Sequence, residues 1–183
     1  MQKAYRQATS GLIGLAIGAG CGGSSPGTTA TEPASVEYVE QSIQQSLDRL
    51  EALSIVHVGR LVLDLPAEAT SCYGLPPCPG AEEPYRVERA RQAPRVAHLA
   101  SLAEAMRDRY VVPHDKSEAG AALEALAALN VVQVTGLVEA KPANNPECYN
   151  LPCGSDIEAA DRENAKRVGQ VFAIVAAAKA SGL

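Results

Sequence analysis

The sequence predicts an α+β fold in which two tandem, pseudo-symmetric units pack together as one domain. The main observation is an internal repeat, because residues 53–76 align without a gap on residues 129–152 with 11 identical residues in 24 positions. In each stretch a valine-rich run of period two leads into a loop with two cysteines, and apolar patterns of helical period flank both runs. Each unit is therefore expected to run helix, strand, cysteine loop, helix.

Residues 1–20 have the composition of a secretory signal. Lys3 and Arg6 precede an apolar, glycine-rich stretch that ends in small residues directly before Cys21. The stretch is too short and too rich in glycine to be a comfortable membrane span. We therefore expect a signal peptide over residues 1–20 that takes no part in the fold.

Residues 1–21 resemble the lipobox of bacterial lipoproteins, since small residues stand directly before Cys21. The resemblance implies that the Cys21 thiol is diacylated, with palmitate as a typical chain, and becomes the new N-terminus. Gly18 departs from the leucine that family members most often carry there, and the alternative is an ordinary cleaved signal followed by an incidental cysteine. Gly22 stands where an aspartate tends to hold lipoproteins in the inner membrane, so the resemblance favours the outer membrane.

The rest of the chain divides into a tether and one domain. Residues 21–34 combine the lipidated N-terminus with a stretch rich in Gly, Ser, Thr and Pro that is expected to be flexible. Residues 35–183 are long enough for a single α+β domain with its own core. Repeat one is expected to span about 35–110 and repeat two about 114–183. Because Trp is absent and Phe occurs once, the core is expected to be aliphatic.

The charge of the mature chain argues against a nucleic-acid partner. Removal of Lys3 and Arg6 with the signal leaves 14 Lys and Arg against 21 Asp and Glu, a formal net charge of −7. Such a chain does not attract phosphate-rich ligands or anionic lipid by general electrostatics. Contact with the membrane is therefore expected through the N-terminal lipid.

Four helices are expected from apolar residues at spacings of three and four. Ser35 is the expected N-cap of the first helix. The second begins near Pro84, and Pro94 inside it should kink or divide it. The third covers residues 117–129. The fourth begins with a Ser-x-x-Glu capping box at residues 155–158.

Strands are expected over residues 55–65 and 131–140, where valines recur at every second position on one face. The other face, which includes Leu61, is mixed. Each run contains a glycine, Gly59 or Gly136, and we favour a β-bulge there over a two-residue hairpin turn. Because two strands alone make a weak sheet, a homodimer joined edge to edge is one expected assembly.

The five cysteines are expected to divide into one lipid attachment site and two disulfides. With Cys21 lipidated, Cys72 and Cys78 close one small ring and Cys148 and Cys153 another, as expected of an exported protein. Pairing across the repeats is the main competitor. The other alternative is a zinc site built from all four thiolates, although its spacings are looser than usual. The interpretation with two local disulfides involves no metal and no cofactor.

Each cysteine loop also carries a tyrosine and a Leu-Pro pair. These are Tyr73 and Leu75 in the first loop, and Tyr149 and Leu151 in the second. An exposed tyrosine on a rigid loop is a good binding anchor, because it loses little entropy on contact. The alternative is that each tyrosine packs over its own disulfide.

The histidines give little support for catalysis. His57 and His98 align with glutamines in the second unit, which keep hydrogen bonding and lose acid–base function, and His114 has no evident partner. No nucleophile elbow, zinc-protease motif, phosphate loop or dinucleotide fingerprint occurs in the mature chain. A small periplasmic, hydrolase-like enzyme with a site between the repeats, using His57, His98 and a carboxylate, is therefore the alternative.

Taken together, these patterns favour a non-enzymatic lipoprotein of the bacterial cell envelope. Its domain would present the two disulfide-closed loops as a structural or partner-binding surface, and the expected partner is an envelope protein or a second copy of the chain. The competing hypotheses are the hydrolase-like enzyme and a metal-binding protein that uses the four cysteines.

Overall fold

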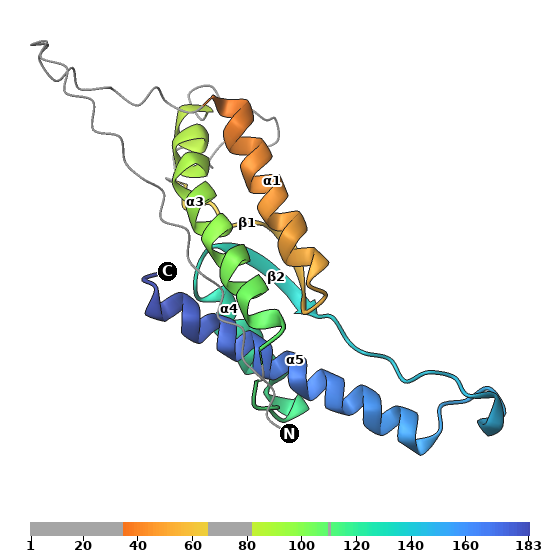
Figure 1. The fold of residues 1–183 in the computed structure, drawn as a ribbon. Helices are drawn as coiled ribbons and strands as arrows, with labels where there is room; N and C mark the ends of the chain where they lie inside the picture. Colours follow the sequence, from red (N-terminus) through yellow and green to blue (C-terminus); the bar gives the residue numbers. More distant parts are fainter. Residues whose placement is uncertain (1–34, 66–81, 110) are drawn as a thin grey trace, which may run out of the picture. The chain divides into compact units, whose positions relative to one another are not determined.

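In the structure, a computed structural model, residues 35–65, 82–109 and 111–183 are described. They form the α+β fold that the sequence predicts, with four α-helices, two short 3-10 helices and one two-stranded antiparallel sheet (Figure 1). In chain order the elements are α1 (Val36–Ala52), β1 (Val56–Leu61), α3 (Glu82–Arg107), η1 (Lys116–Glu118), α4 (Ala119–Ala127), β2 (Val132–Leu137), η2 (Pro146–Cys148) and α5 (Gly154–Ala180).

Several sequence predictions fall outside these residues. They are the signal peptide, the lipidation site at Cys21, the tether, and the first cysteine loop with Cys72, Tyr73, Leu75 and Cys78. None of the helices formed by the described residues has the length and apolar character needed to span a membrane.

Helix α1 begins at the expected cap. The side chain of Ser35 accepts a hydrogen bond from the backbone N–H of Tyr38 at 3.4 Å. Ile43 and Leu50 are buried, whereas Val36, which fits the same spacing of three and four residues along the helix, is 53% exposed. The apolar face of this helix therefore starts later than its sequence pattern predicts.

Both helices that precede a strand end in a left-handed residue. Ser54 follows α1 and Asn130 follows α4, and each has a φ of 54°. The N–H of Ser54 donates to the carbonyl of Glu51 at 3.0 Å, and the N–H of Asn130 donates to the carbonyl of Ala127 at 3.0 Å. The repeat alignment equates these residues pair by pair, so the two helix-to-strand turns have the same backbone hydrogen bond.

The sequence predicts that Pro94 kinks or divides this helix; α3 is continuous through Pro94, so the helix is not divided there. Proline removes one backbone hydrogen bond and crowds the preceding turn. Ala93 and Val96 on either side are buried in the core. Because tertiary packing supplies most of the stability of a helix in a protein, it outweighs this local cost.

The start of α5 also differs from the prediction. The N-cap is Cys153 and not Ser155, and its N–H donates to the Oδ2 atom of Asp156 at 3.0 Å. One cysteine of the disulfide is thus also the N-cap residue of α5. Ile157 fits the apolar spacing of this helix but is 46% exposed, because the first turns of α5 lie beyond the core.

The two strands pair in an antiparallel register that is centred on one pair of residues equated by the repeat alignment. Val58 pairs with its equivalent Val134, and the register brings Leu61 opposite Val132 and Val56 opposite Leu137. Register shifts occur on both sides of the Val58 pair, so that bulges lie close to the two glycines. The predicted bulges are confirmed, and the hairpin-turn alternative is wrong.

The bulge in β1 changes which side chains face the core. Two residues, Gly59 and Arg60, lie opposite the single residue Gln133, so the alternation of the strand shifts by one position. Leu61 is therefore buried, although strict alternation places it on the mixed face, and Arg60 is exposed. The sequence assignment of Leu61 was wrong for this reason.

The core is aliphatic, as predicted, and lies between the sheet and the helices. Helix α1 packs on α3, α4 packs on α5, and α3 contacts α5 (Figure 1). Its largest fully buried apolar side chains are Val96, Leu99, Val131, Val132, Val168 and Val171. Each half of the domain thus contributes to one shared core. That the halves arose by tandem duplication stays a prediction.

Candidate functional site

The second cysteine loop, residues 145–153, is a compact loop outside the sheet and is called the Tyr149 loop below. The sulfur atoms of Cys148 and Cys153 are bonded, with an Sγ–Sγ distance of 2.03 Å. This is the local pairing that the sequence analysis expects for this loop. Helix η2 lies on one side of the ring and α5 starts on the other, so the ring is bounded at both ends by helical backbone.

Asn145 holds the loop together through its backbone and its side chain. Its N–H donates to the carbonyl of Leu151 at 3.1 Å, and its carbonyl accepts from the N–H groups of Cys148 and Asn150 at 3.0 and 3.1 Å. Its Oδ1 atom accepts from the N–H of Glu147 at 3.0 Å. One asparagine thus satisfies backbone groups on both sides of the ring, which fixes the shape of the loop.

These constraints force Tyr149 into an unusual backbone conformation and out into solvent. Tyr149 and Asn150 have φ values of 57° and 59°, in the left-handed region that is uncommon for a tyrosine. The side chain of Tyr149 is 93% exposed and Leu151 is 64% exposed. Such a tyrosine does not pack over its own disulfide, so that alternative is wrong for Tyr149.

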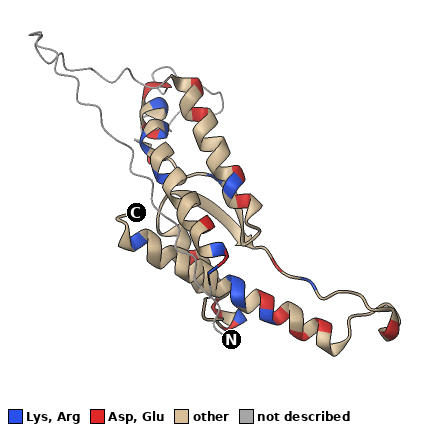
Figure 2. Ribbon diagram, viewed as in Figure 1, with Lys and Arg blue, Asp and Glu red and all other residues tan. Residues whose placement is uncertain are grey.

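The surroundings of Tyr149 and Leu151 are acidic. Residues 145–161 contain four carboxylates and no Lys or Arg; the carboxylates are Glu147, Asp156, Glu158 and Asp161. Figure 2 shows these acidic positions on η2 and on the first turns of α5. Asp161 lies 4.0 Å from Lys116 and Glu158 lies 3.7 Å from Arg162, so Glu147 and Asp156 are the two carboxylates of this segment that form no ion pair among the described residues. The Tyr149 loop therefore combines two exposed apolar side chains with these two carboxylates.

The structure does not bring the histidines together. His57 contacts Glu51 at 3.4 Å, and His98 contacts the hydroxyl of Ser181 at 2.9 Å. His114 contacts Glu118 at 3.2 Å and stacks at a tilt on the ring of Phe172, with ring centroids 4.7 Å apart. These partner sets share no residue, so the described part of the chain does not assemble the His57 and His98 site of the enzyme hypothesis.

The described residues also offer no metal centre. Within residues 35–65, 82–109 and 111–183, no three His, Cys, Asp or Glu side chains gather as ligands would. Cys148 and Cys153 are joined to each other, and a disulfide sulfur does not provide the thiolate that zinc binds. The geometry around these two cysteines therefore does not fit the zinc hypothesis.

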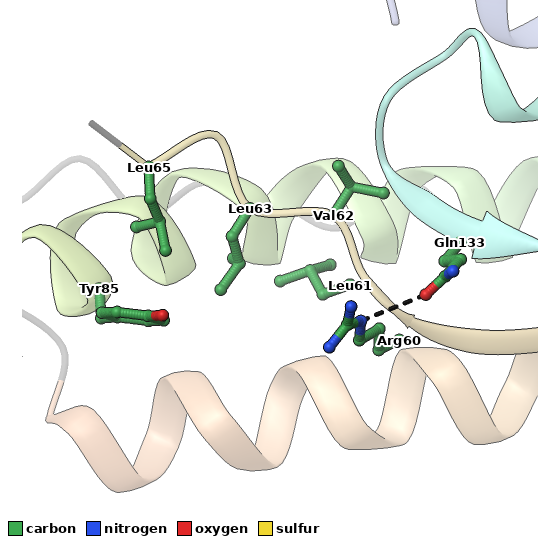
Figure 3. Close-up of a pocket in the computed structure, with 7 residues that line it drawn as sticks. All are labelled: Arg60, Leu61, Val62, Leu63, Leu65, Tyr85 and Gln133. Atoms are coloured by element: carbon green, nitrogen blue, oxygen red, sulfur yellow. Dashed lines mark hydrogen bonds between the residues drawn. The ribbon is translucent and has the colours of Figure 1, made fainter. Parts of the chain in front are cut away.

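A pocket of about 470 Å³, called the leucine pocket below, was not predicted from the sequence. It lies beyond the end of β1, and its lining residues are Arg60, Leu61, Val62, Leu63, Leu65, Tyr85 and Gln133 (Figure 3). A signal for it is nevertheless present in the repeat. Leu63 and Leu65 align with Glu139 and Lys141, so only the first unit has an apolar run at these positions.

Glu88 fixes the segment that lines the leucine pocket. Its Oε1 atom accepts from the N–H of Asp64 at 3.1 Å, and its carboxylate forms two hydrogen bonds of 2.7 Å with Arg91. The Arg91 guanidinium, aided by the bonds from Asp64 and Gln92, lowers the pKa of Glu88 to about 2 despite burial. A charged and fully bonded carboxylate therefore anchors the chain next to the pocket.

The second unit has a corresponding anchor. Asn164 is buried, its Oδ1 atom accepts from the N–H of Ala140 at 2.7 Å, and its amide donates to the carbonyl of Ala140 at 3.2 Å. Ala140 is the residue that the alignment equates with Asp64. Both halves thus fix the chain after the strand with one buried polar side chain from the following helix.

Comparison with protein-family models, with curated proteins and with solved structures gives no match for this chain. The geometry of the described residues therefore carries the functional argument. Its two distinctive features are the exposed Tyr149 loop and the leucine pocket.

Proposed function

We propose that the protein is a lipid-anchored lipoprotein of the bacterial cell envelope whose domain uses the Tyr149 loop to bind a protein partner. The observation that carries the proposal is the 93% exposure of a tyrosine in a left-handed conformation on a disulfide-closed loop. Exposing tyrosine and leucine to water is unfavourable, and holding them on a rigid loop reduces the entropy lost on binding. Rigid aromatic anchors are typical centres of protein interfaces.

The charge around the loop indicates the kind of partner. Tyr149 and Leu151 would enter an apolar depression, while the carboxylates of Glu147 and the first turns of α5 would face Lys or Arg at its rim. Such complementary charges mainly raise the association rate and the specificity. A partner with a basic rim around an apolar pocket fits this surface best.

The anchor is proposed from the sequence of residues 1–21 alone. The resemblance to a lipobox supports a lipid on Cys21 and favours the outer membrane as the location. An envelope location also agrees with the disulfide between Cys148 and Cys153, because such bonds persist in oxidising compartments.

Site-specific photo-cross-linking in intact cells tests the binding proposal. A photoreactive amino acid replaces Tyr149 in one variant and Tyr38, a 65% exposed tyrosine on α1, in the control. We expect a discrete cross-linked protein from position 149 and none from position 38. The product should disappear when Leu151→Asp is added. The proposal fails if both positions give the same products, or if position 149 gives none.

Mass spectrometry of the mature protein tests the anchor. We expect the N-terminal peptide to begin at Cys21 and to carry the mass of a diacylglyceryl group, and Cys21→Ser to abolish this modification. A mature chain that begins at another residue, or an unmodified Cys21, would contradict lipidation while leaving the binding proposal open to its own test.

A further inference from the structure

The side chains that line the leucine pocket have a linear arrangement. Leu61, Leu63 and Leu65 lie in a row that starts at the last residue of β1 and continues into the segment after it (Figure 3). Tyr85 lies at one end of this row and Arg60 at the other. The result is a linear apolar lining with a cation at one end.

The β1 bulge creates this arrangement. Without the extra residue at Gly59 and Arg60, strict alternation would put Arg60 on the same face as Val56 and Val58, toward the core. The bulge instead exposes Arg60 and turns Leu61 inward. Leu63 and Leu65 follow at period two, so the apolar face continues past the last hydrogen-bonded residue of the strand.

Arg60 has little else to bind among the described residues. Its Nε atom donates to the Oε1 atom of Gln133 at 3.2 Å, and none of the carboxylates in that part of the chain is within ion-pair distance. A guanidinium has five N–H donors and pairs in a bidentate manner with carboxylates. Arg60 therefore keeps donors for an anionic ligand at the end of the leucine row.

The second unit shows that the fold does not require this pocket. The alignment places Gly136 at the position of Arg60, Glu139 at that of Leu63, and Lys141 at that of Leu65. The same strand, bulge and buried anchor thus occur there without the cation, and of the three leucines only the first has an equivalent, Leu137. Leu61 belongs to the core and Leu63 packs against it, whereas the half-buried Leu65 has no such core contact and lines the same pocket as the exposed Arg60.

We infer that the leucine pocket binds one single-chain fatty acid, with its alkyl chain along Leu61, Leu63 and Leu65 and its carboxylate on Arg60. The volume of about 470 Å³ lies within the range of about 300–1,000 Å³ that is common for small-molecule sites. One row of leucines and one cation match one chain and one carboxylate, which favours a fatty acid over a two-chain phospholipid. This inference is independent of the Tyr149 loop.

Photolabelling of the full chain in lipid nanodiscs tests the inference. The probe is hexadecanoic acid with a free carboxylate and a diazirine in the alkyl chain, and the labelled peptides are identified by mass spectrometry. We expect label on peptides that contain residues 60–65 or Tyr85, and none on residues 136–141. Unlabelled hexadecanoate should compete, whereas hexadecanol should compete about tenfold less well, because it lacks the charge that Arg60 binds.

Variants separate the contributions of charge and apolar lining. Arg60→Gln should weaken competition by hexadecanoate about tenfold, and Arg60→Lys should retain most of it. Arg162→Gln, at an exposed arginine on α5, is the matched control and should have no effect. Leu63→Glu, which introduces the residue of the second unit, should abolish the label, and circular dichroism checks that this variant remains folded.

Three results would overturn the inference. They are label spread evenly along the chain, label at the pocket that Arg60→Gln does not alter, and preferential labelling by a diazirine-bearing phosphatidylglycerol. Because Arg60 is exposed and lies outside the core, the Arg60 variants remain informative even if Leu63→Glu fails to fold.

Discussion

At the scale of single residues, a few polar or small side chains set the local geometry. Glu88 and Asn164 each fix the chain that leaves a strand, and Asn145 closes the Tyr149 loop. Gly169 allows a close approach, because an added Cβ would lie 2.3 Å from the carbonyl oxygen of Val112. Asn145 acts within its own loop, whereas Glu88, Asn164 and Gly169 each meet a segment that is distant in the sequence.

Glu88 should make the stability of the protein depend on pH. Its folded-state pKa of about 2 lies below the ordinary value of 4.5, so the unfolded chain binds more protons between these values. This contribution is therefore present above about pH 4.5 and is lost as the pH falls toward 2. Glu88→Gln should lower the free energy of unfolding by about 1–3 kcal/mol at neutral pH.

Denaturant unfolding of both proteins between pH 2 and pH 7 measures this difference. It should shrink toward the acid end, where the wild-type carboxyl becomes increasingly protonated as the pH approaches its folded-state pKa of about 2. Glu158→Gln, at an exposed carboxylate on α5, is the control and should change little. A Glu88→Gln difference that is the same at pH 2 and pH 7 would contradict the role of the charge.

A pair of glycine substitutions tests the close approach at Gly169. Gly169→Ala should destabilise the protein by about 1–3 kcal/mol, because α5 and the Val112 backbone must separate. Gly120→Ala in α4 meets nothing within 4 Å and should stabilise it by up to about 1 kcal/mol through helix propensity. Thermal unfolding of both variants gives the signs. Equal effects would mean that the approach at Gly169 is less tight than described.

At the scale of elements, the two-stranded sheet and the turns that lead into its strands determine the arrangement of the surrounding side chains. Ser54 and Asn130 turn the chain from helix to strand with the same φ of 54°, and the strands then pair around Val58 and its equivalent Val134. The bulges decide which leucines are buried and direct Arg60 to the end of the leucine pocket. The position of a single inserted residue in β1 thus determines the character of the surface beyond it.

Replacing the left-handed residue of each turn by glycine should stabilise the protein to different extents. A left-handed backbone costs serine about 1–2 kcal/mol, while asparagine tolerates it better. Ser54→Gly should therefore raise the free energy of unfolding by about 1 kcal/mol, and Asn130→Gly should raise it by less. Denaturant titration of the two variants measures both changes. If Ser54→Gly is destabilising, the left-handed turn after α1 is not the strained position that its φ indicates.

At the scale of the whole molecule, the residues that form the core are different from those that form the proposed binding surface. The core joins α1, α3, α4 and α5 around the sheet, whereas none of residues 141–159 is buried. The Tyr149 loop therefore projects from the domain without supporting its core. Changes in the loop can alter binding while the fold persists.

Removal of the Cys148–Cys153 disulfide should accordingly have a small effect on global stability. The loop-entropy estimate for so short a ring is about 2 kcal/mol, and the global loss should be less because the ring lies outside the buried core. We expect the double variant Cys148→Ser, Cys153→Ser to keep its circular dichroism spectrum and cooperative unfolding. It should nevertheless lose the cross-linked product from position 149. Global unfolding of this variant would show that the loop does support the core.

Much of the local structure follows from the sequence. The caps and apolar periods locate all four described α-helices to within a few residues, and the glycines indicate the bulges. The sequence predictions fail where contacts between distant segments determine the local structure. Packing around Ala93 and Val96 keeps α3 continuous through Pro94, and the start of α5 follows a hydrogen bond between Cys153 and Asp156. Val36 and Ile157 fit an apolar period but lie beyond the reach of the core.

By itself the sequence determined the α+β class, the aliphatic core and the strand bulges, because residue period, composition and glycine placement act through neighbours along the chain. Only the tertiary structure decided that Tyr149 is exposed, that the histidines lie apart, and that Leu61, Leu63 and Leu65 form a row beside Arg60. Exposure and pocket shape depend on which distant segments meet. Contacts between distant segments depend on packing in three dimensions, so they produce no periodic pattern along the sequence.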